Sequence, residues 1–169
     1  MNTNKASEYV QHLQLLPHPE GGYYRETYRS PSHLSVNGLF PGFEGQRNIA
    51  TAIYFLIEQG NFSAFHKIKS DETWHFYAGQ ALEVIEIDES GNLIHTLVGS
   101  QMHSGEQFQY TVKAGRWFAS RVAATGHFSL VGCTVAPGFD FADFEMAKRD
   151  ALIMEFPQHQ AIILALTRG

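Results

Sequence analysis

The sequence contains a single cysteine, Cys133, in 169 residues. One cysteine cannot close a disulfide within the chain, which is typical of proteins from a reducing compartment. Long apolar runs are also missing. None approaches the roughly 20 residues that span a bilayer, and the N-terminal segment has no continuous apolar stretch of the kind found in signal peptides. We therefore expect a cytoplasmic protein without a membrane partner.

Positive charge is scarce as well. Lys and Arg number 12 against 17 Asp and Glu, which gives a formal net charge of −5 at pH 7, and the basic residues form no cluster. Nucleic-acid backbones are bound through dense positive charge, so nucleic acid is not an expected partner. The glycines form no phosphate-binding loop of the dinucleotide or Walker type. Because these partners are not expected, we expect the partner to be a small-molecule ligand.

The middle of the chain is made of short alternating segments separated by turn residues, and they are predicted to be strands. These segments cover residues 23–30, 48–57, 63–70, 72–78, 81–88, 93–99, 106–112, 116–122 and 127–136. Segments so closely spaced, without a βαβ rhythm, predict a mainly all-β sandwich or closed barrel. A jelly roll fits best.

The length of the chain favours one domain spanning residues 1–169. Helical periodicity predicts a short helix at about residues 5–15 and further helices at about residues 140–168, on either side of a barrel at about residues 20–138. The polar segment at residues 30–46 is rich in glycine and proline, and we expect it to be a loop that covers a site.

The segment GNFSAFHKIKSDETWHFYAG, residues 60–79, carries the chemistry that the sequence singles out. Residues two apart in a strand share a face, so Glu72 is expected on the same face as Trp74 and Phe76. If His66 and Glu72 both point into a barrel, an imidazole and a carboxylate meet in an apolar cavity. Burying such groups costs several kcal/mol unless a metal, a ligand or a hydrogen-bond network pairs with them.

This segment resembles the first motif of the cupin superfamily, in which two histidines and a glutamate between two glycines bind a metal. His66 and Glu72 match that motif, but Ile68 stands where its second histidine belongs. The segment QFQYTVKAGRWFASRV is similar to the second cupin motif, with Phe118 at the place of the fourth ligand. Two of four usual ligands are thus kept. The cofactor stays unknown, and a divalent metal on His66 and Glu72 would need a third ligand from the set His75, His127 and Glu26.

A wider resemblance covers about residues 9–145. The segments LLPHPEGGYYRETYRS, SDETWHFYAG, RWFAS and SLVGCTVAPGFDFADFE are similar to one uncharacterised subgroup of cupins. The resemblance implies an RmlC-like jelly roll, or double-stranded β-helix, with no assigned reaction. It also implies a homodimer, in which the strand after PHPEGG joins the sheet of the partner and covers an open edge.

Without a metal, His66 as base and Glu72 as its partner suit proton abstraction next to a carbonyl. Some metal-free cupins act as sugar epimerases in this way, with a tyrosine as the opposing acid. The candidates for that acid are Tyr24, Tyr54 and Tyr110, and Arg25 or Arg47 could stabilise an enolate.

The expected substrate-binding residues are Arg25, Tyr24, Trp74, Phe76 and Phe118, although rings in a barrel also serve simply as core. In the strand at 23–30, alternation places Arg25 and Arg29 on one face and Tyr24, Glu26 and Tyr28 on the other.

Two further features have a plain structural interpretation. Cys133 lies in an apolar strand and is interpreted as a buried small hydrophobe rather than a nucleophile. Asp140, Asp143 and Glu145 lie near the start of a predicted helix, and one of them is interpreted as its cap, with a contact of Asp140 to the pocket histidine as the alternative.

Three functions remain open. The leading hypothesis is an isomerase or epimerase that acts on a carbonyl-bearing metabolite such as a sugar or sugar nucleotide. The alternatives are a metal-dependent oxygenase or lyase and a non-catalytic metabolite-binding protein.

Overall fold

The computed structural model describes residues 3–39, 41–123 and 126–169. Within these ranges the strands are β1 (Leu16–Pro17), β2 (Tyr23–Arg29), β3 (His33–Ser35), β4 (Gln46–Asn48), β5 (Thr51–Glu58), β6 (Phe62–Lys67), β7 (Asp71–Gly79), β8 (Leu82–Ile87), β9 (Leu93–Val98), β10 (Gln109–Val112), β11 (Trp117–Val122), β12 (Phe128–Ala136) and β13 (Glu145–Met146). The helices are α1 (Thr3–His12), α2 (Arg149–Glu155) and α3 (Gln160–Ala165), and the 3₁₀ turns are η1 (Met102–Ser104), η2 (Phe141–Asp143) and η3 (Pro157–His159).

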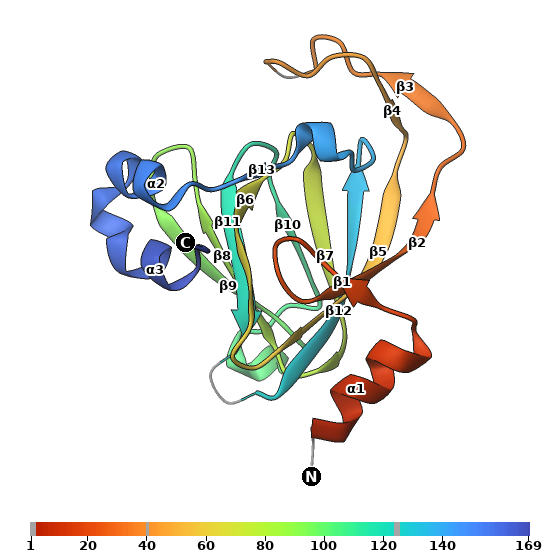
Figure 1. Cartoon of the computed structure of the whole chain (residues 1–169), viewed down its shortest axis with the longest axis vertical. Coiled ribbons are helices and arrows are strands. Elements are labelled where there is room, and N and C mark those ends of the chain that lie inside the picture. The colour runs from red at the N-terminus through yellow and green to blue at the C-terminus, as the bar shows by residue number, and fades with distance from the viewer. Residues whose placement is uncertain (1–2, 40, 124–125) are drawn as a thin grey trace.

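Two antiparallel sheets face each other and form a jelly roll (Figure 1). One sheet has the strand order β1-β2-β5-β12-β7-β10 and the other the order β13-β6-β11-β8-β9. The core between them is apolar, as alternation in β5, β7, β8 and β12 predicts, and it includes Phe55, Trp74, Val84 and Val131. The predicted mainly β jelly roll is confirmed.

The helices lie on the outer faces of the two sheets (Figure 1). On α1, Ala6 packs with Leu56 and Phe128 of the six-stranded sheet. On α2 and α3, Leu152 and Ile163 pack against the five-stranded sheet. The helices predicted near both ends are therefore present, although the first one begins and ends slightly earlier than expected. None of these helices is long and apolar enough to cross a membrane.

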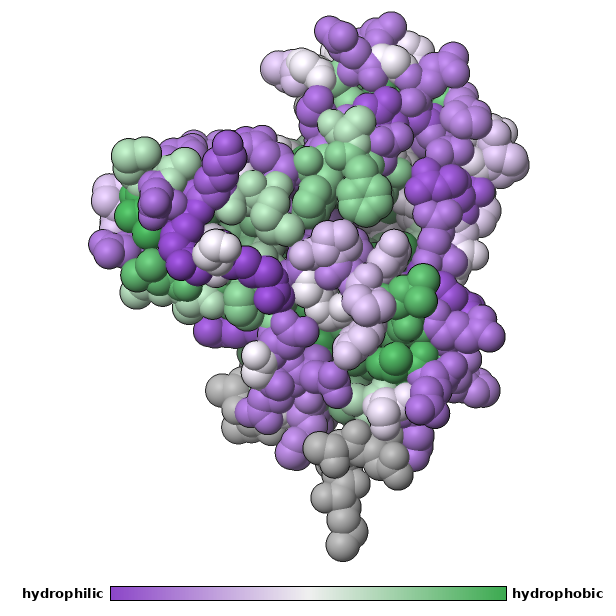
Figure 2. Space-filling view, viewed as in Figure 1, coloured by the Kyte–Doolittle hydropathy of each residue, from purple (hydrophilic) through white to green (hydrophobic). Residues whose placement is uncertain are grey.

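In the described residues of the segment predicted as a covering loop, 30–39 and 41–46, the chain forms an arm instead. Strands β3 and β4 pair with each other and with neither large sheet, and the arm projects away from the barrel (Figure 1). Figure 2 shows mainly hydrophilic residues over it. At its base, Arg47 donates to Asp143 at 2.6 Å and 2.7 Å, which ties the arm to η2.

Candidate active site

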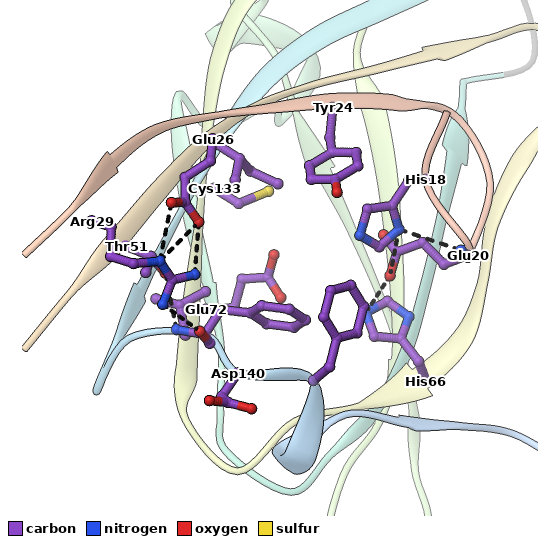
Figure 3. Close-up of a pocket in the computed structure, with 14 residues that line it drawn as sticks. His18, Glu20, Tyr24, Glu26, Arg29, Thr51, His66, Glu72, Cys133 and Asp140 are labelled. Carbon is purple, nitrogen blue, oxygen red and sulfur yellow. Dashed lines mark hydrogen bonds and ion pairs between the residues drawn. The ribbon is translucent and has the colours of Figure 1, made fainter. Parts of the chain in front are cut away.

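A cavity of about 510 Å³ opens into the jelly roll between the two sheets. Its walls come mainly from β2, β5, β7 and β12, the loop between β1 and β2, and the segment that leads into η2 (Figure 3). The lining residues are His18, Glu20, Tyr24, Glu26, Arg29, Thr51, Ile53, His66, Glu72, Cys133, Val135, Phe139, Asp140 and Phe141. His66 and Glu72, the two residues that the sequence singled out, thus line one cavity.

His66 has both ring nitrogens engaged. Nδ1 lies 2.7 Å from the carbonyl oxygen of Ala64, and Nε2 lies 3.1 Å from Oε2 of Glu20. A carbonyl oxygen can only accept, so Nδ1 carries a proton. Between Nε2 and the Glu20 carboxyl there is then one shared proton, because two bare acceptors would repel each other. The pair is either an imidazolium with a carboxylate or a neutral imidazole with a carboxylic acid.

Burial decides between these two forms. Glu20 and His66 are 6% and 2% exposed. Desolvation raises the pKa of Glu20 and lowers the pKa of His66, since it penalises the charged form of each. Both directions favour the neutral form, in which Glu20 holds the proton and donates it to Nε2, and we assign this form to the pair. In either form both nitrogens of His66 are bonded, so His66 has no free nitrogen with which to accept a proton from a ligand.

Glu72 is the buried carboxyl that remains available. It is the second residue of β7, is 8% exposed, and points into the cavity (Figure 3). Burial raises the pKa of Glu72 to about 7, and a hydrogen bond from Cys133 counteracts that rise. A charge on His66 would lower this pKa and a charge on Glu20 would raise it, so a neutral His66–Glu20 pair leaves burial as the main cause. A carboxyl group with a pKa near neutrality exchanges protons readily at physiological pH.

His18 faces the same space with one ring nitrogen free. Its Nδ1 accepts from the backbone N–H of Glu20 at 3.3 Å, so the neutral ring carries its proton on Nε2. Burial lowers the pKa of His18, which keeps the ring neutral. The ring meets Tyr24 edge-on at 4.6 Å between centroids and stacks near Phe141 at 6.4 Å. His18 therefore offers an N–H donor to the cavity.

The sequence PHPEGG, interpreted as a simple turn, carries both His18 and Glu20. Gly21 and Gly22 have φ angles of +116° and +73°, which L side chains rarely adopt. A Cβ on Gly22 would lie 2.7 Å from the carbonyl oxygen of Leu56. The two glycines thus let the loop close tightly against the sheet and direct the preceding side chains inward. The sequence signal is a His and a Glu next to a glycine pair, but a turn sequence by itself does not show that its side chains point inward.

The opposite side of the cavity holds a second charged group, made of Glu26, Arg29 and Asp140 (Figure 3). The expectation that Arg29 lies on the other face of its strand from Tyr24 and Glu26 is wrong. A β-bulge shifts the register of β2 against β5 between Glu26 and Tyr28. The extra residue reverses the alternation, so Arg29 points inward and Tyr28 is 52% exposed.

Of the five residues expected to bind substrate, only Tyr24 lines the cavity, and this is a correction for the other four. Arg25 lies on the outer face of the sheet, with its guanidinium 6.0 Å from the ring centre of Tyr54. Trp74 and Phe118 are each 1% exposed and fill the core. Phe76 packs against that core and borders a shallow hollow on the outer face of the sheet.

Phe118 nevertheless contacts His66 from the core, because the centres of the two rings lie 4.1 Å apart. Tyr54 and Tyr110, considered as the acid, and Arg47, considered as the enolate stabiliser, do not line the cavity. Tyr54 meets Tyr77, Tyr110 donates to Glu86 at 3.1 Å, and Arg47 is paired with Asp143.

The donors do not fit the metal site that the cupin resemblance implies. Ile68 and Phe118 are buried where two ligands would lie, and both nitrogens of His66 are used by Ala64 and Glu20. In residues 3–39, 41–123 and 126–169, no three His, Cys, Asp or Glu side chains are grouped so as to hold a metal ion. Of the proposed third ligands, His75 bonds to Thr134 at 2.9 Å on the outer face, and His127 is outside the lining set.

Glu26, the remaining ligand candidate, pairs with Arg29 at 2.7 Å. Cys133 is buried, as expected, and burial raises the pKa of its thiol, which makes it a weak nucleophile. Asp140 accepts from the backbone N–H of Ala142 at 2.8 Å, so Asp140 is the one of the three acids that caps, and it caps the 3₁₀ turn η2.

Comparison with known proteins agrees with this architecture. A family model described as Cupin superfamily (DUF985) matches residues 7–147. The chain is 30% identical over 154 residues to the uncharacterized protein YML079W of Saccharomyces cerevisiae, and the alignment covers 86% of this chain and 76% of the yeast protein.

Solved structures show the same relationship. A hypothetical protein from Leishmania major is 38% identical with a TM-score of 0.89, over 97% of this chain and 99% of that chain. Protein SO0799 from Shewanella oneidensis is 38% identical with a TM-score of 0.85, over 97% and 98%. Oxalate decarboxylase from Bacillus subtilis is 16% identical with a TM-score of 0.54, over 89% of this chain and 36% of that one, and shares the fold alone. The chain belongs to the cupin superfamily (DUF985).

Proposed function

We propose that the cavity binds a small carbonyl-bearing metabolite and moves a proton on it, as an isomerase or epimerase does. One observation carries the proposal: a buried carboxyl, Glu72, has a pKa of about 7 and faces the N–H of His18 across a cavity large enough for a metabolite. A base and a hydrogen-bond donor on the walls of one hollow are what proton abstraction next to a carbonyl requires.

In the proposed reaction the Glu72 carboxylate takes a proton from the carbon next to the carbonyl. The electron pair of the broken C–H bond moves into a C=C bond, and the carbonyl oxygen becomes negative. His18, through Nε2–H, or Tyr24, through its hydroxyl, donates a hydrogen bond to that oxygen. For an epimer, the Tyr24 hydroxyl delivers a proton to the opposite face of the carbon while Glu72 keeps the proton that it took, and exchange with solvent restores both groups. For an isomer, Glu72 returns its proton to the former carbonyl carbon, and the hydroxyl proton on the adjacent carbon moves to the former carbonyl oxygen.

This assignment gives His66 a different role from the one expected from the sequence. Because its two nitrogens are bonded to Ala64 and Glu20, His66 positions the loop that carries Glu20 and His18. Because the His66–Glu20 pair is neutral, it also brings no positive charge close to Glu72. A fixed positive charge there would lower the pKa of Glu72 and weaken it as a base.

The proposal predicts a defined pH dependence. The base must be ionised, and burial raises the pKa of Glu72 from 4.5 to about 7. We expect kcat/KM to be constant above pH 7 and to fall about tenfold for each pH unit below it. Rates measured from pH 5 to pH 9 with one substrate would show this. A midpoint near 4.5 would mean that an ordinary exposed carboxylate, or another group, is the base.

The direct test is solvent deuterium exchange. The purified chain is incubated in D₂O with a panel of aldoses, ketoses, amino sugars and oxo acids, and deuterium on carbon is read by mass spectrometry. We expect exchange next to the carbonyl of at least one compound. A compound that binds in the cavity without exchange would instead favour the non-catalytic binding protein.

We also propose that two copies of the chain associate through β2. The two residues of β1 pair with Tyr23 and Tyr24, so the rest of β2 is an edge without a strand partner in the described chain. Such an edge offers free N–H and C=O groups to another strand. Tyr28 and Leu16, next to it, are 52% and 64% exposed. Sedimentation at micromolar concentration should give twice the 19.0 kDa of one chain, and a monomer would contradict the proposal.

A further inference from the structure

Glu20 connects the parts of the site through three separate groups. Its carboxyl pairs with Nε2 of His66 at 3.1 Å, and its backbone N–H donates to Nδ1 of His18 at 3.3 Å (Figure 3). Its carbonyl oxygen accepts from the backbone N–H of Ala64 at 2.9 Å. The position of this one residue therefore sets where both imidazoles lie, and whatever holds Glu20 in place acts on the site.

A side chain 148 residues later in the sequence also binds the carbonyl of Glu20. Nε and Nη2 of Arg168 donate to that oxygen at 3.3 Å and 3.2 Å. Nη2 donates as well to Oδ1 of Asn61 at 3.0 Å and to the carbonyl oxygen of Phe62 at 2.9 Å. The guanidinium carbon lies 4.5 Å from the ring centre of Phe62. Arg168 thus joins the loop between β1 and β2 to the start of β6.

The backbone before Arg168 is fixed independently of the cavity. Thr167 is 3% exposed, and Arg149 donates to its hydroxyl oxygen at 2.9 Å and to its carbonyl oxygen at 2.6 Å. Leu166 is buried, and its carbonyl oxygen accepts from the backbone N–H of Phe65 on β6 at 2.8 Å. Arg168 therefore extends from an anchored segment beside the strand that carries the pocket histidine.

The glycine after Glu20 makes room for this guanidinium. Gly21 has a φ of +116°, and a Cβ on it would collide with Nη2 of Arg168 and with the carbonyl oxygen of Phe62. Any side chain at this position would push the loop and the guanidinium apart. The loop and the arginine are thus shaped to fit each other.

The bonds of Arg168 depend on the shape of its head group. Its acceptors are two backbone carbonyl oxygens and one side-chain amide oxygen, which come from two segments of the chain. A guanidinium spreads its N–H groups over a planar fork and can bind both segments at once. The ammonium of a lysine is a single point with three donors, so it can replace only some of these bonds.

We infer that Arg168 is a positioning residue of this site, which fixes the carbonyl of Glu20 and thereby holds His18 and His66 in place. Arg168 does not line the cavity and touches no ligand there. It also lies beyond residues 7–147, which the family model matches. The inference rests on the proposed function for the reaction that the loop serves, and on the contacts of Arg168 for the loop itself.

The test on the reaction compares Arg168→Ala and Arg168→Lys with wild type. We expect Arg168→Ala to lower the rate of deuterium incorporation on carbon roughly tenfold, because small displacements of groups near the reacting atoms are costly. Arg168→Lys should recover part of that rate. Arg121→Ala is the matched control, since Arg121 pairs with Glu83 at 2.7 Å outside the cavity, and it should leave the rate unchanged.

Amide hydrogen exchange tests the loop without any substrate. The N–H groups of Ala64 and Gly21 donate to the carbonyl oxygens of Glu20 and His18 at 2.9 Å and 3.0 Å. We expect both to exchange with solvent roughly tenfold faster in Arg168→Ala. The N–H groups of the β5–β12 ladder should exchange as in wild type. A role in overall stability would instead accelerate all of these amides together.

Unchanged exchange at Ala64 and Gly21, equal acceleration of the whole ladder, or a wild-type rate on carbon in Arg168→Ala would each overturn the inference. Asn61→Ala removes one acceptor without touching Arg168, so it should show the same pattern with smaller changes, and it replaces Arg168→Ala if that variant does not fold. If wild type incorporates no deuterium into any compound, the proposed function is overturned, and the amide pattern alone decides whether Arg168 holds the loop.

Discussion

Glu72→Gln is expected to abolish most proton transfer and at the same time to stabilise the protein at alkaline pH. Glutamine has nearly the same shape as glutamate but cannot accept a proton from carbon. Loss of a general base lowers the rate by roughly 10²- to 10⁴-fold, and we expect deuterium exchange to fall by that factor. Binding of the substrate should be affected much less, because the amide keeps a hydrogen-bonding oxygen in place.

The effect on stability follows from the pKa of Glu72. This pKa is about 7 in the folded protein against an ordinary value of 4.5, chiefly because the group is buried. Between these pH values the folded chain holds a proton that the unfolded chain has lost, so the contribution of Glu72 to stability declines as pH rises from 4.5 to 7. Above pH 7 the ionised group costs roughly 3 kcal/mol. Glutamine avoids that cost.

The measurement is urea unfolding of wild type and Glu72→Gln at pH 5 and pH 8. We expect the free energy of unfolding of the variant to exceed that of wild type by up to about 3 kcal/mol at pH 8 and by little at pH 5. Comparing the two proteins at each pH cancels the opposite contributions of His18 and His66, whose pKa values burial lowers. Glu8→Gln on the exposed face of α1 is the control and should change neither property. If Glu72→Gln exchanged deuterium at the wild-type rate, Glu72 would not be the base.

Much of the fold and the centre of the site could be predicted because both depend on strand alternation. Period-two patterns place Glu72 and Trp74 inside and His75 and Tyr77 outside, which is how β7 is oriented. The face of a strand on which a side chain lies does not depend on distant contacts. His66 and Glu72 could therefore be placed on the walls of one hollow without knowing how the loops close.

The rest of the site depends on features that alternation does not encode. The bulge in β2 that turns Arg29 inward has no marker in the sequence, since Thr27 is an ordinary strand residue. Alternation also gives the face of a side chain but not its depth along the barrel. Trp74 and Tyr24 both point inward, yet Trp74 lies in the core and Tyr24 at the cavity.

The neutral His66–Glu20 pair predicts unequal effects of two substitutions at Glu20. Glu20→Leu leaves Nε2 of His66 buried without a donor, and we expect it to lower the free energy of unfolding by about 1–3 kcal/mol. Glu20→Gln can turn its amide N–H₂ toward Nε2 and restore the bond, so it should cost clearly less. Urea unfolding at pH 7 compares the two variants with wild type.

The tautomer of His66 distinguishes this arrangement from an ion pair. In the neutral pair Nδ1 carries the proton and Nε2 is a bare acceptor, so the nitrogen chemical shifts of the ring should be of two different kinds, both in wild type and in Glu20→Gln. An imidazolium would give two nitrogens with similar chemical shifts in wild type, and these shifts would change in Glu20→Gln.

A neutral pair also brings no charge to Glu72, so Glu20→Gln should leave the midpoint of the pH–rate profile near 7. A midpoint that moves by a full pH unit would mean that Glu20 is ionised and that its charge helps to set the pKa of the base.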